Sequence, residues 1–468
     1  MSKLVALSVL LTTGAALAKG GIPVLLLTGE NNHNWRYTSR MFEDTLESTG
    51  LFDVTVSDDP ADALADWSSL SRYRAIVLDY NGPRWGSEAE ANFVRAVEQN
   101  GAGVVVIHAS NNAFPGWEAY EQMVGLLWRD ATGHGDFHEF DVVWTQPDHP
   151  IAKGMGDLTN HPDELYHALK NPADATFDLL ATAHSSTESR GSGQDEPMAL
   201  VTQYGKGSIF HTPLGHVWDK AEATKASISD PQFKLLIARA TEWVATGRCT
   251  IESVEDVREH NTLTDDEARS GWVSLFDGTR LTGLRGYRET GFPSSGWLIA
   301  DATLQTEGEG PDVVTDKEYE SFEFSCDWKV APGGNSGIIY LVSEDHQYTW
   351  QTGPEMQVLD NARHPDGRDP KTCAGAVYAM IPCAYDVTRP AGEWNHATVK
   401  KNGTHIEHWL NGFKMAEYEI GSDEFKKMVA ASKFASMPDF GKNTKGHIAL
   451  QAHGEAMWYR NVKVRELD

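Results

Sequence analysis

The stretch NSGIIYLVSEDHQYTWQTGPEMQVLDNARHPDG, residues 335–367, decides how we interpret the second half of this chain. It predicts two β-strands, over 337–342 and 355–359, separated by a polar and aromatic loop. Side chains alternate along a strand, so Glu355 and Gln357 share one face of the second strand. A carboxylate and an amide on one sheet face predict the floor of a polar pocket.

A second stretch, HIALQAH at 447–453, repeats this pattern far along the chain. Ile448 and Leu450 share one face of the expected strand, while Gln451 and His453 share the other. Two distant strands therefore each offer a pair of hydrogen-bonding side chains. We expect the folded sheet to bring both pairs into one concave site.

Between residues 271 and 468 the apolar pattern has a period of two, which is typical of strands. The dipeptides Asn402-Gly403 and Asn411-Gly412 are strong hairpin signals, and 423–432 predicts one helical insert. Many short strands with tight turns predict an antiparallel sandwich. The other expected strands lie at 272–276, 322–330, 394–401, 404–410, 413–418 and 458–465.

Residues 21–247 show a different order, in which strand-like and helical patterns alternate. This order predicts a parallel sheet covered by helices on both faces, and a charged segment at 248–270 predicts a linker to the sandwich. The expected strands are 22–27, 52–56, 73–79 and 103–108, and the expected helices are 36–49, 87–99 and 231–245.

Polar residues follow several of the expected strands of this first domain, and ligands of such sheets bind beyond the carboxyl ends of the strands. Imidazole and carboxylate groups suit a divalent metal ion, although the spacing here matches no compact ligand motif. The alternative is that these are polar loop residues bonded to backbone and water. The candidate pocket residues are His33, His108, His149 and Glu164, with further histidines at 134, 138, 211 and 216.

The composition limits the classes of partner. A net charge of −27 argues against nucleic acid and against anionic membrane surfaces, because both need a cationic face. The 15 Trp and 14 Tyr residues suit sugar recognition, although Trp most often fills cores.

The first 18 residues have the features of a secretory signal peptide: Lys3, an apolar run, and a small-x-small site at Ala16-Leu17-Ala18. The apolar run is too short to favour a membrane anchor, so we expect a secreted or periplasmic protein without membrane insertion.

Export permits disulfides. Cys373 and Cys383 can pair across a loop or remain buried thiols, and no CxxC motif supports structural zinc.

The first domain resembles the ThuA-like (trehalose utilisation) family. The resemblance implies a class I glutamine amidotransferase-like sheet. Glutaminase chemistry is excluded because the turn that would carry its nucleophile reads His108-Ala109-Ser110, without Cys, and Ser110 lacks a Gly-x-Ser-x-Gly elbow. The resemblance rests on Leu25–Gly29 with His33, Val106–Ala109, Asp148–Ile151 and Asp163–Tyr166.

The second domain resembles the DUF1080 family, also called the 3-keto-disaccharide hydrolase domain. The resemblance implies a concanavalin-like jelly roll with its pocket on the concave sheet, and sugars oxidised at C3 as small-molecule substrates. Ala452 is a departure, because the family usually has Asp there. The main matching segments are Phe276–Gly278, Gly334–Ile338, Glu355–Asp360, Gly375–Tyr378, Gly392–Asn395, His408–Gly412, Ser432–Phe434, Gly446–Gly454 and Arg460-Asn461.

The expected chemistry follows from the ketone at C3, which acidifies the proton at C2. A base removes that proton, the enolate expels the C1 aglycone, and water then adds. The site needs a base, an acid and a stabiliser of the enolate charge, and a divalent cation is a candidate cofactor for the last role. Candidate catalytic residues are Glu355, Asp360, His408 and His453, with Glu355 and His453 also as metal ligands. Candidate substrate-binding residues are Asn335, Gln357, Asn361, His364, Trp409 and Gln451.

Three other interpretations stay open. Glu355 and Asp360 are the pair that a two-carboxylate glycosidase would use. A binding module would keep the sandwich and the aromatic residues without turnover, and a structural protein would need no polar pocket. His408 alternates with Ile406 and Leu410, so a satisfied core histidine is as good an interpretation as a catalytic one.

Overall fold

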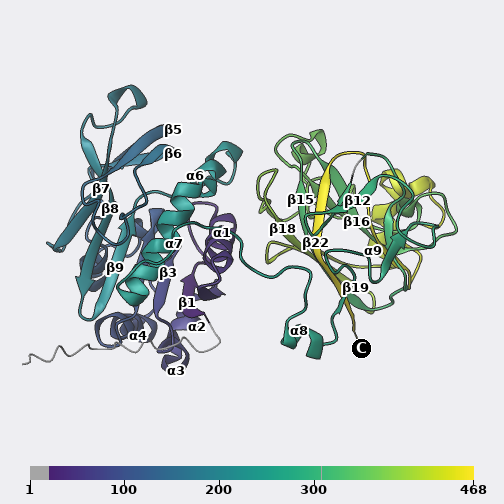
Figure 1. Ribbon diagram of the computed structural model, residues 1–468, viewed down its shortest axis with the longest axis horizontal. Helices are drawn as coiled ribbons and strands as arrows, with labels where there is room; N and C mark the ends of the chain where they lie inside the picture. Colours follow the sequence, from purple (N-terminus) through teal and green to yellow (C-terminus); the bar gives the residue numbers. More distant parts are fainter. Residues whose placement is uncertain (1–20, 307, 468) are drawn as a thin grey trace, which may run out of the picture. The chain divides into compact units, whose positions relative to one another are not determined.

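A computed structural model describes residues 21–306 and 308–467. The expected signal peptide lies outside these described residues. The chain divides into two compact units, one built on a nine-stranded sheet and the other on two smaller sheets (Figure 1). Within the described residues, no helix is long and apolar enough to cross a membrane.

The nine-stranded sheet has the order β2-β1-β3-β4-β9-β8-β7-β5-β6. Its first five strands are parallel, which confirms the predicted parallel sheet: β1 (Ile22–Leu27), β2 (Phe52–Ser57), β3 (Ala75–Leu78), β4 (Gly103–Ile107) and β9 (Gly207–Thr212). The sequence did not predict β9, nor the remaining four strands, which are antiparallel: β5 (Gly133–Trp144), β6 (Leu158–His167), β7 (Phe177–His184) and β8 (Asp195–Tyr204).

Helices cover both faces of the parallel strands (Figure 1). One face packs against α2 (Pro60–Ala65), α3 (Trp67–Leu70), α4 (Ser87–Glu98) and α5 (Glu118–Val124), whose apolar residues share one core with the sheet. The other face packs against α7 (Pro231–Thr246), beside α1 (Trp35–Ser48), with Phe42 and Phe233 in ring contact. The central strands β1, β3 and β4 are apolar along their length because both of their faces are buried.

The second unit consists of two antiparallel sheets, as the period-two pattern predicted. One sheet has the order β12-β13-β22-β15-β18-β19-β20, with β10 (Val273–Ser274) paired to β22. Its strands are β12 (Trp297–Ala300), β13 (Thr303–Thr306), β15 (Phe322–Val330), β18 (Asn395–Asn402), β19 (His405–Leu410), β20 (Phe413–Glu419) and β22 (Met457–Glu466). The other sheet, β11-β14-β21-β16-β17, contains β11 (Leu284–Gly286), β14 (Val313–Thr315), β16 (Asn335–Val342), β17 (Glu355–Leu359) and β21 (His447–Leu450).

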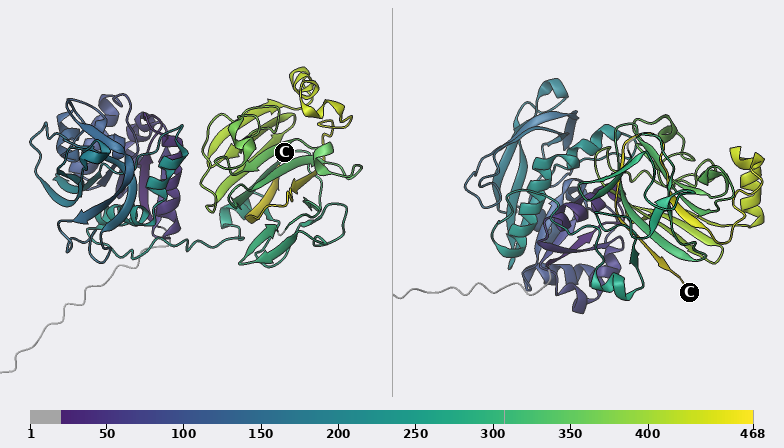
Figure 2. Two further views of the ribbon diagram at one scale, coloured as in Figure 1. Left: turned by 90° about the horizontal axis from the view of Figure 1, so that it is seen from above. Right: turned by 45° about the vertical axis from the view of Figure 1, so that its right-hand side comes forward.

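A continuous apolar core lies between these sheets and includes Trp328 and Tyr459 from one and Ile338 and Met356 from the other. This is the arrangement of a jelly-roll sandwich. Helix α9 (Asp423–Ala430) lies at the margin of the sandwich in both views of Figure 2. It leads into the short helix η6 (Lys433–Ser436).

The structure settles the cysteine alternatives. Cys373 and Cys383 form a disulfide, while Cys249 and Cys326 are free. The segment between the paired cysteines is not a regular strand. It forms a turn with an isolated bridge from Val377 to Met356, which holds it against β17.

Candidate active site on the concave sheet of the sandwich

Strand β16 joins the two polar stretches, because it lies between β17 and β21. Gly337 pairs with Gln357 and Ile339 pairs with Glu355. On the other side, the backbone N–H of Gln451 donates to the Gly337 carbonyl at 3.0 Å. Paired residues project from the same face of a sheet, so all these polar side chains emerge on one side.

A cavity of about 420 Å³ opens on this face, which is the size range of small-ligand sites. Glu355 is the one carboxylate among the residues that line it. The lining residues are Asn335, Trp350, Glu355, Gln357, Tyr378, Lys433, Phe434, Met437, Gln451 and His453.

Gly337 makes room for the Glu355 carboxylate. A Cβ atom at position 337 would overlap the Glu355 carboxylate oxygen and its neighbouring carbons. A side chain there would push the carboxyl group out of its position, so the glycine acts through the space that it leaves.

Burial controls the charge of Glu355. Its side chain is 7% exposed, and burial raises the pKa of its carboxyl to about 8. Lys433 opposes this shift, while the carboxylates of Asp312 and Asp366 add to it. At neutral pH the carboxyl therefore keeps its proton and can donate it.

Two buried amide oxygens of the cavity lining have no hydrogen-bond partner among the described residues. They are Oδ1 of Asn335 and Oε1 of Gln357, on side chains that are 6% and 2% exposed. A buried acceptor without a partner is costly, so such atoms are rare in native proteins. A hydroxyl-bearing ligand would satisfy both.

His453 lies at the rim with its ring held at both nitrogens. Nδ1 is 2.9 Å from the Glu455 carboxylate, and Nε2 is 3.4 Å from Nδ2 of Asn335. A carboxylate only accepts, so Nδ1 carries the hydrogen and Nε2 keeps a lone pair. This is the orientation that a general base needs.

Lys433 and Tyr378 form another wall of the cavity. The Lys433 ammonium lies 4.1 Å from the centre of the Tyr378 ring, and the Tyr378 hydroxyl donates to Asp366 at 3.1 Å. We did not predict either residue as part of the site, although both belong to segments on which the family resemblance rests. Lys433 places a positive charge beside the buried carboxyl.

Five of the predicted site residues do not line this cavity. Asp360 accepts hydrogen bonds from the backbone N–H groups of Gly333 and Ala362, so its carboxylate stabilises a turn. The side-chain oxygen Oδ1 of Asn361 accepts a hydrogen bond from the backbone N–H of Ala374. Both residues follow β17 directly, where the chain turns.

The other three are His364, His408 and Trp409. His364 caps a short helix by accepting from the backbone of Asp366. His408 is fully buried, bonded to the Tyr340 hydroxyl at 2.8 Å and to the Gly375 carbonyl, and burial lowers its pKa to about 4. It is the satisfied core histidine of our alternative interpretation. The Trp409 ring nitrogen donates to Glu407.

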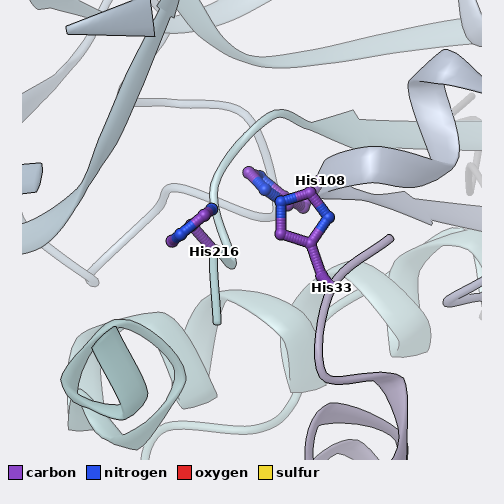
Figure 3. A group of neighbouring side chains, drawn as sticks. All are labelled: His33, His108 and His216. Atoms are coloured by element: carbon purple, nitrogen blue, oxygen red, sulfur yellow. The ribbon is translucent and has the colours of Figure 1, made fainter. Parts of the chain in front are cut away.

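The groups of described residues with metal-ligand geometry do not include the predicted Glu355 and His453. One group is His33, His108 and His216, whose rings are neighbours (Figure 3). Two residues that we predicted for the pocket of the first domain are not members of this group. His149 packs against Trp243, and Glu164 is 3.4 Å from His134 with its pKa raised to about 7 by burial.

Fold and site together define a class: an α/β domain followed by a jelly-roll sandwich with a polar, sugar-sized cavity on one sheet. Residues 271–465 match the 3-keto-alpha-glucoside-1,2-lyase-like domain family, and residues 23–244 match the trehalose utilisation (ThuA) family. The chain belongs to these families, as the resemblances indicated.

Individual relatives match the two halves separately. A 3-keto-disaccharide hydrolase from Bacteroides thetaiotaomicron is 32% identical over 230 residues, which is 42% of this chain and 79% of the relative. A candidate glycosyl hydrolase structure from Parabacteroides distasonis is 33% identical, with a TM-score of 0.42, and the match covers 45% of this chain and all of the relative. A candidate ThuA-like structure from Parabacteroides merdae is 33% identical, with a TM-score of 0.44, over 49% of this chain and 92% of the relative.

Proposed function

We propose that this protein cleaves the glycosidic bond of 3-keto-glycosides by elimination, in the cavity of the sandwich. The proposal rests on the buried, protonated Glu355 carboxyl beside Lys433. His453 lies at the same cavity, and the Glu455 carboxylate orients its ring. The named activity of the Bacteroides relative and the family match support the same substrate class.

His453 is the base of this mechanism. Its Nε2 lone pair takes the C2 proton, while Glu455 stabilises the imidazolium through Nδ1–H. The electron pair of the C2–H bond moves toward C3 and places negative charge on the ketone oxygen. The Lys433 ammonium is the nearby positive charge that stabilises this enolate.

Glu355 is the acid. When the enolate collapses, the C1–O bond breaks and the leaving oxygen takes the proton of the Glu355 carboxyl. The product is a 1,2-unsaturated 3-keto sugar. Addition of water across that double bond converts this lyase product into the hydrolysis product. The free acceptors of Asn335 and Gln357 hold sugar hydroxyls in this scheme.

The paired-carboxylate glycosidase has less support, because Asp360 is bonded to backbone N–H groups and is not part of the cavity lining. The binding module remains a second candidate, since free amide acceptors suit binding as well as turnover.

Matched aryl glucosides, with and without a ketone at C3, test the proposal in D₂O. We expect release of the aryl group from the keto sugar only, deuterium at C2 of hydrated product, and a loss of about 10²–10⁴-fold in turnover for Glu355→Gln. Glu424→Gln, on an exposed position of α9, is the control. Turnover of the unoxidised glucoside would favour a glycosidase, and saturable binding without product would favour a binding module.

We further propose that the chain is exported, on the basis of its N-terminal leader pattern and the Cys373–Cys383 disulfide. Mass spectrometry of the mature N-terminus after cell fractionation tests this. A cytoplasmic protein that keeps residues 1–18 would contradict it.

A further inference from the structure

We propose that His33, His108 and His216 form a binding site for one divalent transition-metal ion of the zinc class. This proposal is independent of the function proposed for the sandwich. Each of the three rings offers one nitrogen, and these nitrogens all lie within 4.8 Å of one another. All three residues are buried, with exposed fractions of 7%, 3% and 4%.

The sheet topology explains why residues so far apart in sequence meet here. His33 follows β1, His108 follows β4 directly, and His216 follows β9. These strands belong to the parallel part of the sheet, so their carboxyl ends lie at the same edge. Ligands of such sheets bind at that edge. Figure 3 shows the three rings gathered there from three separate segments.

The ring of His108 is oriented for metal binding. Nδ1 lies 2.7 Å from the Pro213 carbonyl, which only accepts, so Nδ1 carries the hydrogen and Nε2 keeps the lone pair. The hydroxyl of Tyr166 lies 2.9 Å from Nε2. A metal ion would replace that hydroxyl as the partner of Nε2.

The backbone of His108 has a conformation that suggests a functional position. Its φ is 45°, a left-handed value that is uncommon for residues other than glycine. Such outliers cluster at active sites and ligand sites, where the surrounding structure maintains the strain. Here the residue begins the turn after a central strand and points its ring toward the other two histidines.

The other two rings are held by packing. His33 and His216 meet edge to face at 4.8 Å between ring centres, and His216 stacks on Trp218 at 5.9 Å. Since little ring movement is needed to gather the three nitrogens, less conformational entropy is lost on binding.

The donor set selects the kind of ion. Three neutral imidazoles suit zinc, which catalytic sites often bind with three protein ligands and an open fourth position. Calcium and magnesium prefer oxygen ligands, so this donor set disfavours them.

A second group, His405, Glu407 and Glu417, has metal-ligand spacing as well. Lys414 already pairs with both of its carboxylates, at 2.9 and 2.7 Å, so we do not propose a site there.

Titration of the full-length chain tests the site after removal of metal with a chelator. We expect one zinc ion per chain by elemental analysis, a rise in melting temperature on zinc addition, and an X-ray absorption spectrum with histidine nitrogens at about 2.0–2.1 Å and no sulfur. For His33→Gln and His216→Gln we expect a larger loss of affinity than the ~10–100-fold that follows loss of an outer-shell partner. His405→Gln and His149→Gln are the matched controls and should bind zinc normally.

Three results would overturn the proposal: no zinc bound by the native chain, zinc retained by both His33→Gln and His216→Gln, or zinc lost only in His405→Gln. Circular dichroism of the metal-free variants checks that they fold. If they do not fold, the absorption spectrum of the native chain decides, because a ligand shell of oxygen or sulfur without histidine would refute the site.

Discussion

The two faces of the β16–β17 strand pair both carry polar groups, but these groups are bonded differently. On the core face the Tyr340 hydroxyl is bonded to both His408 and Tyr418, at 2.8 and 2.7 Å. Ser336 on the same face is bonded to Tyr459 and to the carbonyl of Gln451. On the cavity face, amide oxygens of Asn335 and Gln357 have no partner among the described residues.

This difference shows that polarity within a strand does not itself indicate function. Buried polar groups of a structural core satisfy one another, because each unsatisfied group would cost stability. A substrate-binding site without substrate leaves some of its hydrogen-bond donors or acceptors without a partner. The unused acceptors, and a carboxyl that keeps its proton, distinguish the cavity face from the core face.

After Glu355→Gln, the largest effect that separates the two faces is expected for Lys433→Met. This change removes the positive charge that stabilises the enolate, so turnover of a 3-keto-glucoside should fall by about 10²–10³-fold. Lys426→Met, on an exposed position of α9, is the control and should retain full activity. Equal turnover in both variants would remove Lys433 from the mechanism.

The charge of Glu355 predicts a pH dependence of stability. Its pKa rises on folding from 4.5 to about 8, so between these values the folded state binds more protons than the unfolded state. The contribution of Glu355 to stability therefore decreases as pH rises through this window. Glu355→Gln should be more stable than the native chain by up to a few kcal/mol at pH 8, and by little near pH 4.

Urea unfolding of both proteins at several pH values measures this difference. A constant difference across the window would mean that the Glu355 carboxyl is not protonated in the folded state at neutral pH.

For His408, which lies on β19 and is bonded to Tyr340 of the core face, the change His408→Leu should reduce stability and leave the chemistry nearly intact. The change removes two hydrogen bonds of a buried ring, which predicts a loss of about 1–3 kcal/mol in the free energy of unfolding. At substrate saturation, kcat of the folded variant should stay within about threefold, since His408 does not line the cavity. A large fall in kcat with unchanged stability would place His408 in the reaction.

The smallest expected effect is that of Gly337→Ala. The added methyl group would overlap the Glu355 carboxyl and displace it, so kcat should fall by about tenfold, as a small misplacement of a reacting group predicts. Gly291→Ala is the control, because a Cβ there meets nothing within 4 Å. Equal activity of the two variants would show that the Glu355 carboxyl tolerates displacement.

The sequence predicted the fold where a regular pattern covers whole elements. Continuous apolar runs gave the parallel strands β1, β3 and β4, and the shorter pattern at 52–56 gave β2. The period of two gave strands such as β15, β18 and β19 within one or two residues. The parallel strand β9 and the antiparallel strands β5 to β8 were missed. Much of β5 and β7 alternates between more and less buried positions, and aspartate and glutamate residues at the open positions weaken the apolar signal.

For the site, strand alternation correctly indicated that Glu355, Gln357, Gln451 and His453 share one cavity. It could not indicate Lys433 and Tyr378, because these come from a short helix and a turn, whose direction depends on tertiary packing. It also could not separate Asp360 from the cavity residues, since a carboxylate that follows a strand can cap a turn equally well. The grouping of His216 with His33 and His108 depends on the order of the strands, which the sequence pattern did not provide.

The covalent link between Cys373 and Cys383 has a practical consequence for anyone producing this protein. The loop closed by this disulfide contains Tyr378, so the disulfide restrains one wall of the cavity in which the proposed chemistry occurs. Recombinant protein made in a reducing cytoplasm would lack this restraint. Preparations from oxidising and reducing hosts are therefore expected to differ in apparent substrate affinity, even when both are folded.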